Sequence, residues 1–130
     1  MIQSNAYDYV DILDKAADAS WTRENLIANN IANVDTPGYK RQDLEFEELL
    51  KDELGRNQYI SLDKKVRNAN LNHLEPNVFT DYAGYSYRLD GNNVDIDVEQ
   101  VELASEQIKY QALTGSISSQ FERMRISMGR

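Results

Sequence analysis

Both ends of this chain carry long segments compatible with a single helix, and that pairing constrains the fold more than any other feature. Residues 6–33 contain neither glycine nor proline, the two residues that interrupt helices most strongly. Residues spaced alternately three and four apart form a helix-packing seam, namely Val10, Leu13, Ala17, Ser20, Glu24, Ile27, Ile31 and Val34, with Ser20 and Glu24 as polar interruptions. We predict one long helix, whose length and narrow stripe favour coiled-coil or inter-subunit packing over ordinary packing on its own domain.

A second long helix is predicted for residues 95–128. Acidic residues near its start and arginines near its end have the signs that the helix dipole favours. It carries two apolar stripes: the first is Val94, Val98, Val101, Ala104, Ile108 and Ala112, and the second is Leu103, Tyr110, Ile117 and Met124, with Phe121 and Met128 beside it. A single partner in the same chain needs only one stripe. Two stripes therefore indicate more than one neighbour, which hints at polymerisation.

Turn signals separate the two helices. Pro37 and Gly38 suit the central positions of a type II turn, because glycine accepts a positive φ, and residues 46–54 could form a short acidic helix. The asparagine-rich stretch up to residue 81 resembles an excursion with little core of its own. Tyr85, Tyr87 and Leu89 alternate with polar residues before Asp90-Gly91, which fits a short strand or β-arm.

The expected fold is therefore mainly α. Long N- and C-terminal helices pack as an antiparallel coiled coil around an irregular middle segment that contains a short β-arm. We expect one structural domain made of an N-terminal axial helix (1–35), a turn, loop and β excursion (36–93) and a C-terminal axial helix (94–130).

Charge and composition exclude several classes of function. The chain has 14 Lys and Arg against 22 Asp and Glu, a net charge of −8, so nucleic acid and anionic membrane surfaces are poor partners. It has no cysteine, which excludes disulfides and thiolate metal sites. No stretch approaches the ~18 apolar residues of a membrane span. The N-terminus lacks the features of a signal peptide, so we expect any export to leave it uncleaved.

Searches for catalytic and ligand-binding patterns are negative. His73 is the sole histidine and has no sequence neighbour that could build a catalytic triad. The acidic run 90–95 fails as an EF-hand, because the third ligand position is Val94 and the closing position is Val101. We predict no catalytic residue, cofactor, metal or small-molecule substrate, and hence no enzyme.

Thirteen consecutive residues, 29–41, carry a specific resemblance. Their sequence, NNIANVDTPGYKR, is similar to the N-terminal signature of the flagellar axial proteins, the rod, hook and hook-associated proteins. The C-terminal half, notably Asp90 to Asp95, Glu99 and Ile108 to Leu113, resembles the proximal rod members of the flagellar basal-body rod family. The assembly motif that this resemblance assigns is Asn29, Asn30, Ile31, Asn33, Thr36, Pro37, Gly38 and Tyr39.

The resemblance implies a structural subunit whose terminal helices form the inner tube of the rod, where it crosses the periplasm or cell wall. The implied partners are other copies of itself, other rod proteins, the basal adaptor protein and the flagellar type III export gate. A gate-recognition motif of the family, a phenylalanine followed four residues later by an apolar residue, is matched by Phe46 and Leu50. An equally good reading of that pair is a hydrophobic contact on a short helix.

Two other readings remain open from the residues alone. A cytoplasmic helical adaptor or secretion chaperone would also be acidic and helical, but it would not need the signature at 33–39. A cell-wall hydrolase would need a carboxylate pair in a cleft, and the chain has little core with which to build one. Asn25, Asn29 and Asn33 share one helical face, where they either bond across subunits and fix register or form exposed polar surface.

Overall fold

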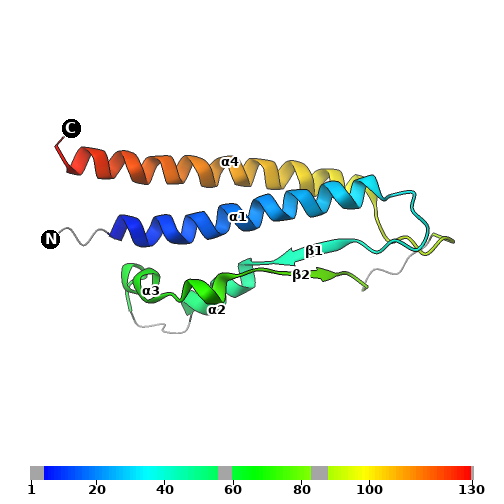
Figure 1. Cartoon of the computed structure of the whole chain (residues 1–130), viewed down its shortest axis with the longest axis horizontal. Coiled ribbons are helices and arrows are strands. Elements are labelled where there is room, and N and C mark those ends of the chain that lie inside the picture. The colour runs from blue at the N-terminus through cyan, green and yellow to red at the C-terminus, as the bar shows by residue number, and fades with distance from the viewer. Residues whose placement is uncertain (1–4, 56–59, 83–87, 130) are drawn as a thin grey trace.

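The computed structural model describes residues 5–55, 60–82 and 88–129. It is elongated and mainly helical, with three layers that run along the long axis (Figure 1). The elements are α1 (Asn5–Ala32), β1 (Gln42–Glu45), α2 (Glu47–Gly55), α3 (Leu62–Asn68), the 3₁₀ helix η1 (Leu71–Leu74), β2 (Asn77–Thr80) and α4 (Ile96–Ser127). Two long terminal helices joined by a small two-stranded sheet and short helices confirm the predicted fold class.

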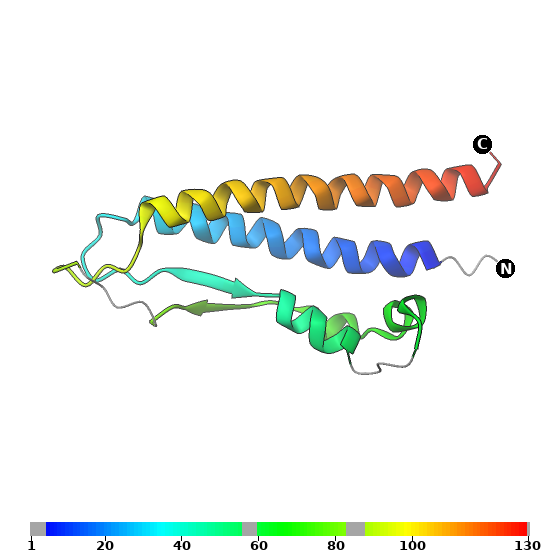
Figure 2. The ribbon, with the colours of Figure 1, turned by 180° about the vertical axis from the view of Figure 1, so that it is seen from behind.

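Helices α1 and α4 lie side by side and run in opposite directions, so both chain ends are at the same end of the molecule (Figures 1 and 2). The predicted seam of α1 supplies this contact. Ala17 and Ile27 are buried, and Ser20 on the same face bonds to Glu106 of α4. Helix α4 begins where Asp95 caps it, accepting hydrogen bonds from the backbone N–H groups of Asp97 and Val98.

The two strands form an antiparallel ladder in which Gln42 pairs with Thr80 and Glu45 with Asn77. This sheet lies on the side of α1 opposite α4 (Figure 2). The β-arm expected at 85–89 falls mostly on residues 83–87, outside the described residues. Its last member, Leu89, lies in a turn and is fully exposed. The Asp90-Gly91 pair turns the chain, with Gly91 at φ +78°, but it leads into the cap of α4 rather than into a returning strand.

The segment between the long helices supplies most of the core, which corrects the expectation of an excursion with little core. Leu44, Phe46, Val66 and Leu74 are buried in one cluster with Ile12 and Ala19 of α1. The expectation was wrong because polar residues of this segment cap its short helices. Asn70 caps η1 and Ser61 caps α3, while single apolar residues between them reach inward.

The short acidic helix expected at 46–54 is α2, Glu47–Gly55, and its existence is confirmed. No helix within the described ranges is both long and apolar enough to cross a membrane.

Candidate functional site

The signature segment, residues 29–41, includes the last turn of α1 and the turn that follows it. Backbone N–H of Tyr39 donates to the carbonyl of Thr36 at 3.2 Å, and Gly38 has φ +74°. These two features define the type II turn that Pro37 and Gly38 predict. The turn reverses the chain so that β1 packs back along α1.

Asn30 is the centre of this junction and is fully buried. Its Nδ2 donates to the carbonyl of Gln42 at 2.9 Å and to Glu99 Oε2 at 3.3 Å. Its Oδ1 accepts from the hydroxyl of Tyr39 and from the backbone N–H of Gln42, both at 2.9 Å. One amide therefore joins α1, the turn, β1 and α4.

A second buried amide, Asn92, comes from the segment that precedes α4 and contacts the chain just after the end of α1. Its Nδ2 lies 2.9–3.0 Å from the carbonyl oxygens of Asn33, Val34 and Thr36. These carbonyls lie in the turns that follow α1, between Ala32 and Pro37. Backbone N–H of Gly38 also donates to the carbonyl of Asp90 at 2.7 Å, so the two connecting turns are held together.

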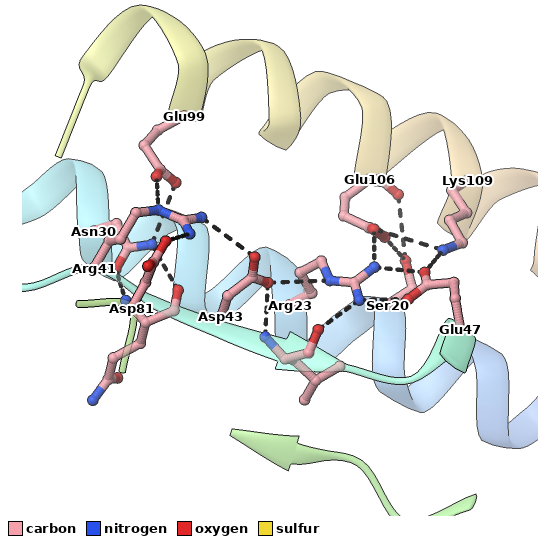
Figure 3. A network of polar contacts seen from close by, with 12 residues as sticks. Ser20, Arg23, Asn30, Arg41, Asp43, Glu47, Asp81, Glu99, Glu106 and Lys109 are labelled. Carbon is pink, nitrogen blue, oxygen red and sulfur yellow. Dashed lines mark hydrogen bonds and ion pairs between the residues drawn. The ribbon is translucent and has the colours of Figure 1, made fainter. Parts of the chain in front are cut away.

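Arg41 forms the first of two charged contacts with α4 (Figure 3). Its Nε lies 2.5 Å from Oε1 of Glu99, which is 1% exposed. The same guanidinium pairs with Asp81 at 3.0 Å and with Asp43 at 3.4 Å. We call this group, Arg41 with Glu99, the first clamp.

Arg23 forms the second clamp with Glu106, two helical turns further along α4 (Figure 3). Its Nη1 lies 2.7 Å from Oε1 of Glu106, which is buried, and its Nη2 donates to the carbonyl of Leu44 at 2.7 Å. Ser20 donates to the other Glu106 oxygen at 2.6 Å. Glu47 accepts from Arg23 at 2.7 Å and also pairs with Lys109.

The electrostatics keep these groups charged. Hydrogen bonds from Arg23 hold the pKa of Glu47 far below its usual value of 4.5, and Lys109 lowers it further. Bonding to Glu47 and then Glu106 raises the pKa of Arg23. Burial alone would lower the pKa of Arg41, but its bonds to Glu99 and Asp81 outweigh that effect and raise it.

The two clamps fix how α4 sits on the rest of the chain. Glu99 and Glu106 are seven residues apart and meet separate arginines from the N-terminal half. Sliding or rotating α4 would leave buried carboxylates without their partners, which is strongly unfavourable.

The predicted helix-packing residues divide into two groups. Ala17 and Ile27 of α1 are buried, and Val10, Leu13, Tyr110, Ile117 and Met124 are half-buried at or near the α1–α4 contact. By contrast, Val101, Ile108 and Phe121 are 51–69% exposed. The structure therefore brings one stripe of α4 against α1 and leaves the other on the surface.

The residues of the assembly motif do not all gather at one place. Asn30 and Tyr39 join the junction, Asn29 donates to the Tyr39 hydroxyl at 3.1 Å, and Asn33 bonds back to the carbonyl of Asn29 at 2.8 Å. Ile31 is half-buried, and Thr36, Pro37 and Gly38 are exposed. Of the shared amide face, Asn25 is exposed.

Phe46 and Leu50, the candidate gate motif, lie in or against the core. Phe46 is 3% exposed, and Leu50 packs against the same cluster. Backbone N–H of Leu50 donates to the carbonyl of Phe46 at 2.9 Å, in the first turn of α2. The folded chain therefore covers this motif.

His73 is exposed and has a partner that the sequence did not reveal. Its Nδ1 lies 2.8 Å from Glu53 Oε2, which ties η1 to α2. Within the described residues, no group of three or more His, Cys, Asp or Glu side chains could hold a metal.

Sequence reasoning missed both clamps. Arg23 and Glu106 lie in no motif, and Arg41 and Glu99 lie in the segments that carry the family resemblance without any indication that they pair. One signal was available: Ser20 interrupts the apolar seam of α1, and the structure places Glu106 against it.

Comparison with known proteins supports the signature. The model of the family described as flagella basal body rod protein matches residues 16–40. The flagellar basal body rod protein FlgB of Bacillus subtilis strain 168 is 37% identical over 114 residues, which cover 87% of each chain. The chain belongs to the FlgB family of flagellar basal body rod proteins.

Other FlgB proteins have similar sequence identity to this chain. That of Escherichia coli K12 is 32% identical over 109 residues, covering 78% of this chain and 79% of the relative. That of Borrelia hermsii is 32% identical over 126 residues, covering 90% and 93%. As a member of the FlgB family, the protein is a structural subunit of the proximal rod of the basal body. It assembles there with other rod proteins.

Proposed function

We propose that this rod subunit polymerises with copies of itself into a drive shaft that transmits torque and encloses the export channel. In this proposal residues 1–35 and 94–130 are the axial segments that form the inner tube, and residues 36–93 form the outer excursion. The observation that carries the proposal is the pair of clamps, in which two buried glutamates of α4 are held by arginines of the N-terminal half.

Torque transmission requires subunits whose elements resist sliding and rotation. Apolar side chains alone resist these motions weakly, because the hydrophobic effect is non-directional. Charged hydrogen bonds are directional and add geometric specificity. Two clamps seven residues apart on one stiff helix therefore suit α4 to carry load without changing its register.

The assembly motif has a structural part in this proposal. Asn30 and Tyr39 hold the junction together, while Thr36, Pro37 and Gly38 form an exposed tip at the end of the helix pair. We assign the exposed tip to contacts with neighbouring rod proteins, or with the adaptor protein at the base.

The burial of Phe46 limits when the export gate could recognise this motif. If the export gate reads Phe46 and Leu50, it does so before the chain folds, because the core covers Phe46 afterwards. The subunit would then fold as it joins the rod. The proposal assigns no catalytic step to any residue.

Deletion and complementation of the gene test the proposal. Cells without it are expected to be non-motile, with basal-body rings but no rod, and the intact gene restores both. The double variant Pro37→Ala, Gly38→Val should not restore them, because valine is strained at φ +74°. Asp52→Asn, an exposed change in α2, is the matched control and should restore motility. Motile deletion cells with complete rods would overturn the proposal.

A further inference from the structure

The first predicted stripe of α4, which contains Val98, Val101 and Ile108, lies uncovered, and the exposed apolar surface continues to Ile126 near the end of the helix. Val98, Val101, Ile108 and Ile126 are 52%, 69%, 68% and 63% exposed. Separations of 3, 7 and 18 residues bring them to one side of a helix with 3.6 residues per turn. In the described part of the chain, nothing packs over them. Exposed apolar surface of this extent marks an interaction site.

Small residues occupy the middle of the same face. Ala112, Gly115, Ser116 and Ser119 are exposed, and a Cβ built on Gly115 would meet nothing within 4 Å. A neighbouring helix that carries a large side chain at this level could therefore approach closely.

The outward face of α1 is acidic and carries a large aromatic side chain, in contrast to the apolar face of α4 with its small residues. Trp21 is 55% exposed although its ring also contacts Tyr110, with centroids 5.8 Å apart. Asp11, Asp14 and Asp18 are exposed on this side of the helix. Within the described ranges, their carboxylates make no ion pair or hydrogen bond.

Charge complementarity connects the two faces. Arg123 lies on the outward side of α4 near its C-terminal end, is exposed, and has no acidic partner in the described residues. The acidic face of α1 and this arginine are at the same end of the molecule, because the helices are antiparallel (Figure 1). They lie on different faces, so one copy can offer both at once.

A single antiparallel register satisfies all of these features together. If Asp14 of one copy lies opposite Arg123 of another, then seven residues further along α1, Trp21 lies opposite Ser116. Four residues beyond that, Asn25 lies opposite Ala112. In this register the indole of Trp21 lies against the small residues of α4, and the carboxylate of Asp14 lies beside the guanidinium of Arg123. Within its own chain Trp21 contacts Tyr110 and Ser20 contacts the backbone of Glu106, so the second copy is displaced by about six to eleven residues, roughly 9–16 Å along the axis.

We propose that the outward face of α1 packs against the outward face of α4 from a second copy of this chain in the same orientation, with Asp14 beside Arg123. This inference rests on the proposed polymerisation and names the surfaces that carry it. Because the two faces differ, the contact repeats from copy to copy, and its axial offset makes a helical array rather than a flat ring.

Disulfide trapping tests the register directly, since the chain has no cysteine. The double variants Asp14→Cys, Arg123→Cys and Asn25→Cys, Ala112→Cys are expressed in deletion cells, and isolated basal bodies are oxidised. Each pair should give a ladder of covalent multimers on a non-reducing gel. The mismatched variant Asn25→Cys, Arg123→Cys, displaced by eleven residues, should remain monomeric.

Charge reversal gives an independent measurement. Asp14→Arg alone and Arg123→Asp alone should each abolish swimming, and the chain carrying both should recover it. Asp52→Arg controls for charge alone and should swim. Complete rods without ladders, or single reversals that swim normally, would overturn this interface and leave the rod function standing. Failure of the intact gene to restore rods would instead overturn the polymerisation itself.

Discussion

Arg41 Nε lies 2.5 Å from Oε1 of Glu99, a carboxylate that is 1% exposed on α4. The arginine follows α1 directly after the turn, so the pair joins the two halves of the chain at the end opposite the termini. Breaking a buried pair on one side leaves a charge without compensation, whereas replacing both partners removes that penalty.

Arg41→Ala should lower the free energy of unfolding by about 3–5 kcal/mol, measured by urea denaturation. The double variant Arg41→Met, Glu99→Leu should lose less than the single variant, because no buried carboxylate is stranded. Arg125→Ala, which removes an exposed pair with Glu122, is the control and should leave the midpoint unchanged. A single variant as stable as the wild type would contradict the clamp.

Asn30→Ala should destabilise the fold by about 1–3 kcal/mol, because several buried groups lose a hydrogen-bond partner. The groups include the backbone N–H of Gln42 and the hydroxyl of Tyr39. Asn25→Ala, one and a half turns earlier and exposed, is the matched control. Equal midpoints for the two variants in thermal unfolding would show that Asn30 is not the centre of the junction.

Gly38→Ala should destabilise by about 1–2 kcal/mol, because an L-residue is strained in the left-handed region. There is open space around this position and φ is +74°, so the penalty is conformational rather than steric. Gly55→Ala at the end of α2, where φ is not positive, should not destabilise. Chemical denaturation of both variants makes the comparison.

Acid should weaken the second clamp. The pKa of Glu47 is lowered from 4.5 in the folded chain by Arg23 and then Lys109, so the folded state binds this proton less tightly than the unfolded state. Its contribution is present above pH 4.5 and is lost as pH falls toward the folded pKa. Glu47→Gln should therefore reduce the free energy of unfolding near neutral pH and make that free energy fall less steeply as the solution is acidified. Glu48→Gln, at the exposed neighbouring residue, should have neither effect.

Glu24 should act in the opposite direction. Burial, and then the charge of Glu106, raise its pKa, and its Oε1 is buried without a hydrogen-bond partner in the described part of the chain. The folded state binds this proton more tightly, so the carboxylate becomes unfavourable as pH rises through the folded pKa. Glu24→Gln should raise the melting temperature near neutral pH, while Glu102→Gln on the exposed side of α4 should not.

The parts of the fold that local pattern controls were predictable. The glycine- and proline-free stretch of α1 and its three–four seam predict both the helix and the face it buries, because helical periodicity places those residues on one side. The turn at Pro37 and Gly38 follows from the φ preferences of two residues. The core contribution of Val66 and Leu74 did not follow, because single apolar residues among turn formers carry no period.

The sequence by itself determined that two long helices bracket the chain, that a type II turn ends the first, and that the chain carries a rod-family signature, since each depends on neighbours within a few residues. Only the tertiary structure decided which polar side chains are buried together. Arg23 and Glu106 are 83 residues apart, and Asn30 and Glu99 are 69 apart. The attraction of such pairs depends on mutual geometry and exclusion of water, which no local pattern encodes.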